Sequence, residues 1–166
     1  LPKAIVLYND GSVSDLKNTP YSHYSFLGSL LWAFFWKISN FNYEYFGRIF
    51  YLALYIFSIL NFLTLIKVNK YIKIISFIFL ILITYDYWHF RGSQEILIFS
   101  FLLILSKFLI NIILENKNTN LNISLIFLYL NLIIWTKNEG IILSILIVFI
   151  LLTFLKENIK FKLILL

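Results

Sequence analysis

The sequence contains no cysteine and few charged residues, and these two absences exclude several classes of protein. Without cysteine, the 166 residues can form neither a disulfide nor a thiolate metal site. Charged residues make up 13% of the chain, whereas a soluble domain carries about a quarter. Hydrophobic residues account for 61%. A soluble core of this size cannot absorb the long apolar runs that result, so the composition predicts an integral membrane protein.

Proline and glycine are also scarce, with two and five copies, and the apolar runs between the polar segments are long. They are continuous and do not alternate as the strands of a membrane barrel would, so they predict helices. The predicted fold class is all-α, a polytopic helical membrane protein whose transmembrane domain covers residues 46–166. We expect about five spans, near residues 46–66, 72–89, 95–114, 121–136 and 140–156.

Acidic residues are outnumbered by basic ones, 8 to 14, which gives a net charge of +6. Such a charge is compatible with nucleic-acid binding, but the lysines lie in short linkers between the apolar runs, so we expect no nucleic-acid partner. Alternate linkers of a helical series lie on one side of the membrane, and an excess of lysine marks the cytoplasmic side. The linkers at 86–95 and 136–140 are then predicted outside, with residues 1–45. The lysines concerned are Lys67, Lys70, Lys73, Lys117, Lys156, Lys160 and Lys162.

Residues 25–38 form a shorter apolar and aromatic segment. About fourteen residues are short for a span, and Trp32, Trp36 and Lys37 suit the interfacial zone where aromatic rings lie at headgroup level. We therefore predict that residues 1–45 are an extracytoplasmic loop with a juxtamembrane helix at about 25–38. The alternative is that this helix crosses the bilayer, which would place residues 1–24 in the cytoplasm.

Both ends of the sequence suggest an internal piece of a longer protein. There is no methionine, and the first residues lack the charged start, apolar run and small-residue cleavage site of a signal peptide. The last residues, 162–166, resemble the beginning of another span.

A polar segment at residues 86–95 contains Arg91 and ends in Glu95, where the third span opens. A carboxylate at a helix start is favoured by the helix dipole, and Ser93 could cap the same end. The functional alternative is a carboxylate at the outer boundary that holds a metal ion, positions a sugar hydroxyl or accepts a proton. The planar guanidinium of Arg91 suits a phosphate.

A second polar segment joins the last two predicted spans and contains Lys137, Glu139 and Gly140. One interpretation is a neutral turn in which the two charges screen each other. The other is that Lys137 contacts a phosphate at membrane depth as a point charge.

A third polar segment, residues 21–24, carries Tyr21 and His23. Tyr21 can be an interfacial aromatic residue and His23 a polar loop residue. No second histidine lies at metal spacing, so the sequence predicts no zinc site.

The order of these segments resembles the GT-C superfamily of integral membrane glycosyltransferases, which includes protein O-mannosyltransferases and lipid A aminoarabinose transferases. Residues 92–95 resemble the Gly-x-x-acid motif of the second external loop, and residues 135–140 a later external motif. Residues 21–24 lie where the family often has Tyr-Pro-Pro or His-Pro-Pro, although here the prolines are missing. The resemblance extends from about Thr19 to Leu155.

The resemblance implies transfer of a sugar from a polyprenyl-phosphate donor to an acceptor at the extracytoplasmic face, with inversion. An enzyme of this kind would lie in a bacterial inner membrane among its lipids, and a divalent metal ion is compatible with the chemistry. The family's catalytic Asp lies in the first external loop, and Asp10 and Asp15 are its candidates here. Glu95 would orient the acceptor or a metal ion. The residues implied in substrate binding are Lys137, Glu139, Arg91, His23 and Tyr21.

Three other classes remain. A transporter or flippase would place polar groups near the bilayer midplane, on broken helices, and Lys107 is the main charged residue inside a predicted span. A polysaccharide polymerase or ligase would rely on a large external loop late in the chain. A structural subunit would leave the external charges unexplained.

Overall fold

The computed structural model describes residues 2–9, 12–19, 26–40, 43–84, 93–113 and 120–154. Within these ranges every regular element is a helix and no strand is present, which confirms the all-α class. The elements are α1 (Pro2–Tyr8), the 3-10 helix η1 (Val13–Asn18), α2 (Leu27–Ser39), α3 (Glu44–Leu63), α4 (Lys70–Thr84), α5 (Gln94–Ile113), α6 (Asn120–Thr136) and α7 (Glu139–Phe154).

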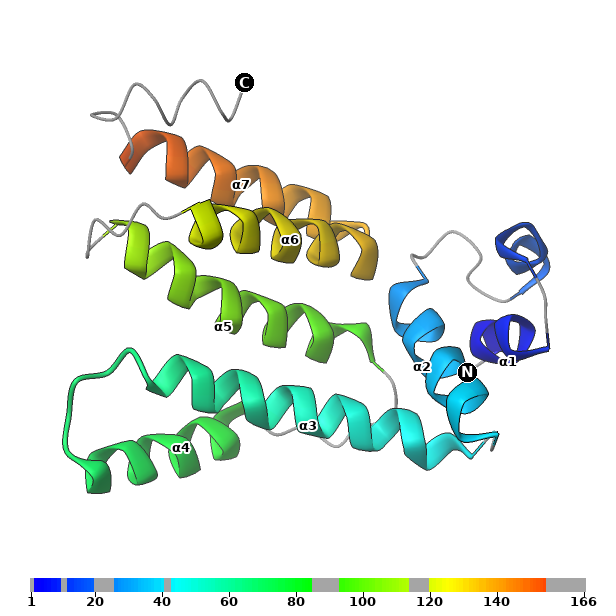
Figure 1. Cartoon of the computed structure of the whole chain (residues 1–166), viewed down its shortest axis with the longest axis horizontal. Coiled ribbons are helices and arrows are strands. Elements are labelled where there is room, and N and C mark those ends of the chain that lie inside the picture. Colours follow the sequence, from blue (N-terminus) through cyan, green and yellow to red (C-terminus); the bar gives the residue numbers. More distant parts are fainter. Residues whose placement is uncertain are drawn as a thin grey trace.

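Helices α3 to α7 lie side by side as a bundle, while α1, η1 and α2 gather at one of its ends (Figure 1). Helix α5 is central, because it packs against α3, α6 and α7. Its side chains Leu97 and Leu105 are fully buried, as are Ile59 of α3 and Ile133 of α6. Helices α4 and α7 are at the two edges of the bundle, and no residue of α4 is buried.

Two helices in the described part of the chain are long and apolar enough to cross a membrane, at Tyr45–Leu63 and Gln94–Ile113. A helix of 20 residues is about 30 Å long, which matches the hydrocarbon core. Helix α3 ends at Leu63, before the predicted limit of residue 66. Residues 64–66 instead form a turn in which the backbone N–H groups of Thr64 and Leu65 bond three residues back, at 3.2 and 3.0 Å.

Helix α2 crosses the end of the bundle at a steep angle to α3 and α5 (Figure 1). Trp32 and Trp36 are buried against other side chains, with exposed fractions of 3% and 2%, and their position at headgroup level stays a prediction. Gly47 of α3 allows the close approach, since a Cβ there would overlap the Trp32 ring. The indole N–H of Trp36 donates to the carbonyl of Tyr43 at 2.7 Å. Trp32 and Trp36 therefore hold α2 against the start of α3, the first by packing and the second by a hydrogen bond.

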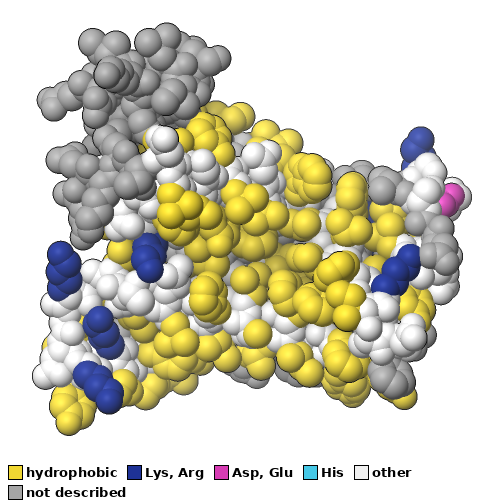
Figure 2. Space-filling view, viewed as in Figure 1, with side chains coloured by type: hydrophobic (Ala, Val, Ile, Leu, Met, Phe, Trp, Pro, Cys, Tyr) yellow, Lys and Arg dark blue, Asp and Glu magenta, His cyan; other side chains and the backbone are white. Residues whose placement is uncertain are grey.

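On the face shown in Figure 2, apolar side chains cover the middle of the bundle and the charged ones lie toward its two ends. On the outer helices, Ile75 and Leu82 of α4 and Ile142 and Phe149 of α7 are each more than 60% exposed. A contiguous apolar surface of this kind marks a membrane or partner contact.

Candidate functional site

Glu95 occupies the first turn of α5, at the end of the bundle where α2 lies. The hydroxyl of Ser93 donates a hydrogen bond to its carboxylate. The positive end of the helix dipole stabilises a negative charge at this position. Ser93, expected from the sequence as a helix cap, thus contacts the carboxylate itself.

Lys137 lies in the short turn between α6 and α7, at the same end of the bundle. The turn is closed by the Gly140 N–H, which donates to the carbonyl of Lys137 at 2.8 Å. A Cβ at Gly140 would overlap the backbone carbonyl of Ile133, so only glycine allows α7 to start this close to α6. This tight hairpin fixes where the lysine side chain begins.

The structure brings Glu95, Lys137 and Glu139 together. The ammonium of Lys137 donates to a carboxylate oxygen of Glu95 at 2.8 Å and lies 3.4 Å from one of Glu139. Lys137 has 23% of its side chain exposed, while Glu95 and Glu139 have 53% and 59%. The cation is thus the most covered member, and its carboxylate partners line the solvent side. The cluster is accessible from the end of the bundle.

Hydrogen bonding to Glu95, followed by the negative charges of Glu95 and Glu139, raises the pKa of Lys137 above its usual value. Lys137 therefore stays protonated at neutral pH and can act as a fixed cation, not as a base. A lysine ammonium has three N–H donors. One donates to Glu95 and the group lies near Glu139, so the ammonium keeps donor capacity for a further acceptor such as a phosphate oxygen.

The sequence alone paired Lys137 with its neighbour Glu139. It did not identify the closer partner, Glu95, which is 42 residues away. The available signal was topological, because the linkers at 86–95 and 136–140 were both predicted on one face. That placement could suggest that the two linkers lie near each other, but it could not identify Glu95 as the partner of Lys137.

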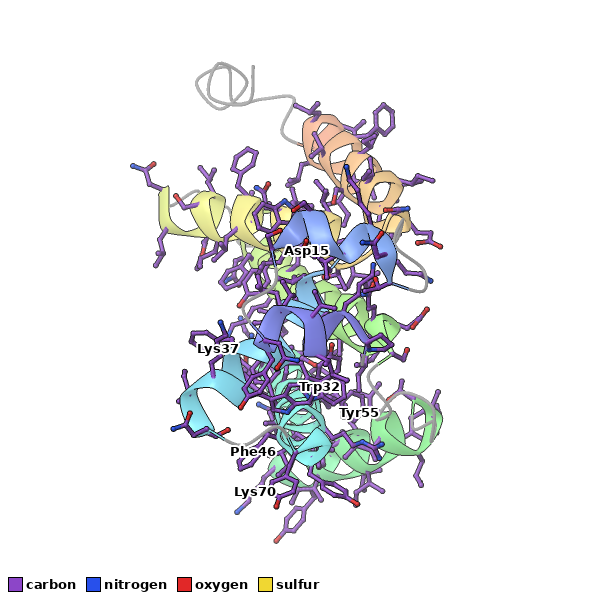
Figure 3. The ribbon with its side chains drawn as sticks, turned by 90° about the vertical axis from the view of Figure 1, so that its right-hand side faces the viewer. Asp15, Trp32, Lys37, Phe46, Tyr55 and Lys70 are labelled. Atoms are coloured by element: carbon purple, nitrogen blue, oxygen red, sulfur yellow. The ribbon has the colours of Figure 1, made fainter. Side chains whose placement is uncertain are left out.

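Asp15 belongs to a different segment. Its carboxylate accepts hydrogen bonds from the backbone N–H of Ser12 at 2.6 Å and from the Ser12 hydroxyl at 2.8 Å, which caps η1. These bonds, the backbone one foremost, lower the pKa of Asp15. Figure 3 faces this end of the molecule and shows Asp15 on η1, apart from the packed side chains around Trp32. Its observed role is to cap a helix.

The remaining predicted site residues lie outside the described ranges: Asp10, Tyr21, His23 and Arg91. Within those ranges there is no group of three or more His, Asp or Glu side chains arranged to hold a metal ion.

A second polar contact between helices lies toward the opposite end of the bundle. The ammonium of Lys107 on α5 donates to the carboxamide oxygen of Asn61 on α3 at 2.8 Å. This bond gives the one basic residue of α5 a polar partner and links the two helices.

Comparison of the chain with protein-family models, curated proteins and solved structures finds no match.

Proposed function

We propose that the chain is part of a membrane glycosyltransferase that moves a sugar from a polyprenyl-phosphate donor to an acceptor at the extracytoplasmic face. The observation that carries the proposal is the contact between Glu95 and Lys137. Two residues expected separately, from two motifs 42 positions apart, lie together at one end of an apolar bundle. The exposed apolar surface of α4 and α7 supports a position of this bundle in a bilayer.

In this reaction the acceptor oxygen forms a bond to the anomeric carbon of the sugar, while the bond from that carbon to the phosphate oxygen breaks and the lipid phosphate leaves with the bonding electrons. Lys137 stabilises the negative charge of that phosphate through its remaining donor capacity. Glu95 fixes the ammonium group and offers an oxygen to an acceptor hydroxyl. Because the Glu95 carboxylate already accepts bonds from Lys137 and Ser93, its role is to orient groups, and the base that takes the acceptor proton is another residue.

A transporter is less well supported by the same contacts. Lys107 is bonded to Asn61 between two adjacent helices, as expected for a contact that holds helices together in lipid. On the face shown in Figure 2, the charged side chains lie toward the two ends of the bundle.

The test is sugar transfer in membranes that contain the protein, with a panel of polyprenyl-phosphate sugars and with release of polyprenyl phosphate as the readout. We expect Lys137→Gln to raise the apparent KM for the donor by about ten-fold or more, since a hydrogen bond to a charged group contributes about 1.5–3 kcal/mol. Glu95→Gln should lower kcat. Lys17→Gln, which removes an exposed lysine from η1 at the same end, is the matched control and should leave both constants unchanged.

Normal kinetics for folded Glu95→Gln and Lys137→Gln would contradict the proposal. The predicted orientation has its own test, because the chain provides a cysteine-free background. Ser12→Cys, Ser93→Cys and Asn138→Cys should all react with an impermeant thiol reagent in intact cells. If Ser12→Cys alone is protected, α2 crosses the bilayer and the N-terminal segment lies on the other side.

A further inference from the structure

A groove of about 240 Å³ lies between α3 and α4, at the end of the bundle opposite to Glu95. Its α4 wall carries residues spaced three and four apart, which places them on one face of the helix. The same spacing holds on α3, so the groove is formed by two parallel stripes of side chains. The lining residues are Leu60 and Leu63 of α3, Thr64 directly after it, and Lys70, Lys73, Ile74 and Phe77 of α4.

The chemistry of the groove changes along its length. Lys70 and Lys73 lie at the start of α4, and Ile74 and Phe77 follow within the next turn of the same face. From Lys70 to Phe77 the helix advances about 10 Å. An occupant that matches this wall is anionic at one end and hydrocarbon over the rest.

The two lysines are available to an anion. Lys70 is exposed and Lys73 half-buried, and within the described ranges neither forms a hydrogen bond or ion pair with a carboxylate. The first turn of α4 contains no acidic residue. Figure 2 shows lysines gathered at this end of the molecule beside the apolar surface of the bundle. The site is therefore positively charged where it meets the solvent.

The groove is also open to the surroundings of the bundle. None of the α4 side chains is buried, and Ile74 beside the lysines is 46% exposed. The helix is held to α3 through packing and a hydrogen bond between the hydroxyls of Tyr55 and Thr84. A molecule in the surrounding lipid can thus enter the groove from the side, without any separation of helices.

We propose that this groove is a binding site for an anionic phospholipid, with the phosphate at Lys70 and Lys73 and an acyl chain along Ile74 and Phe77. Lysines beside a groove between membrane helices recognise acidic headgroups in this way. A soluble phosphate would use the lysines alone and would leave the apolar wall uncovered. The inference needs the bundle to lie in a bilayer, but it does not depend on sugar transfer.

The test is a titration of the detergent-purified protein with phosphatidylglycerol, followed by native mass spectrometry, with phosphatidylcholine as the zwitterionic comparison. Each lysine near an anionic lipid contributes about five-fold in affinity, and two contribute up to about 30-fold. We expect losses of this size in Lys70→Gln and in the double variant Lys70→Gln/Lys73→Gln. Lys67→Gln removes an exposed lysine from the same end that does not line the groove, and it should weaken binding less than Lys70→Gln does.

Two further experiments distinguish binding through the acyl chain from binding through the phosphate alone. Ile74→Gln places a polar group in the apolar part of the groove and should weaken phosphatidylglycerol binding several-fold while both lysines remain. Glycerol 3-phosphate, which has the phosphate without the chains, should not compete at equal concentration. If Lys67→Gln and Lys70→Gln lost the same affinity for phosphatidylglycerol, the lipid would be attracted by the general surface charge and not bound in the groove. That result would overturn the proposal. Full competition by glycerol 3-phosphate, or equal binding of phosphatidylcholine, would also overturn it.

Discussion

The two ends of the helical bundle differ in how their charges are arranged. At one end, the ammonium of Lys137 lies between the carboxylates of Glu95 and Glu139. At the other, residues 60–84 contain three lysines and no acidic residue. The first end therefore combines opposite charges from separate helices, whereas the described residues 60–84 at the second carry lysines alone. The difference indicates two kinds of chemistry, a built polar cluster on one side and attraction of anions on the other.

The largest expected effect comes from breaking the hairpin that positions Lys137. In Gly140→Ala the new Cβ would overlap the backbone carbonyl of Ile133, which cannot move as a flexible side chain does. Overpacking of this kind costs about 1–3 kcal/mol. We expect the free energy of unfolding in mixed detergent micelles to fall by about that amount.

The control for this change is Ile142→Ala, two residues further along α7, where the side chain is 69% exposed. It should alter the free energy of unfolding by no more than about 0.5 kcal/mol. If Gly140→Ala were equally harmless, the close contact between α6 and α7 would not be what sets the position of Lys137.

A smaller effect is expected from the charges themselves. Exposed ion pairs contribute about 0.2–1 kcal/mol, and Glu95 and Lys137 are partly exposed. A double-mutant cycle with Glu95→Gln and Lys137→Gln should give a coupling energy within that range. Because Lys137 lies closer to Glu95 than to Glu139, at 2.8 against 3.4 Å, the cycle with Glu139→Gln should give a smaller value. A larger coupling energy with Glu139 than with Glu95 would mean that Lys137 mainly balances the charge of its neighbour within the turn.

Much of the fold could be predicted from the sequence, because long runs of Ile, Leu and Phe between short polar segments specify helices locally. Residues 46–66 and 95–114, for example, correspond to α3 and α5 with ends shifted by one to three positions. The turn at residues 64–66 was missed because Thr and Leu there do not interrupt an apolar run, and the polar residues that follow only begin at Lys67.

The position of Trp32 could not be predicted from its own segment. An aromatic and basic helix of about fourteen residues is typical of a membrane interface, and the burial of Trp32 depends on a space left by Gly47 on another helix. The contact of Lys137 with Glu95 also depends on helices that are distant in the sequence, because it arises only when α5 and α6 pack together. Local patterns define helices, whereas contacts between distant residues require the packed structure.

The smallest effect is expected at the positive end. Lys70→Gln should change the free energy of unfolding by no more than about 0.5 kcal/mol in neutral detergent, because within the described residues this lysine has no carboxylate partner to lose. Removal of one of several like charges can even stabilise the protein slightly. Addition of phosphatidylglycerol should then raise the melting temperature of the wild-type protein more than that of Lys70→Gln/Lys73→Gln, because a ligand stabilises the folded state in proportion to its occupancy. A loss of more than about 1 kcal/mol in neutral detergent would instead reveal an ion pair at this end, and the contrast between the two ends would disappear.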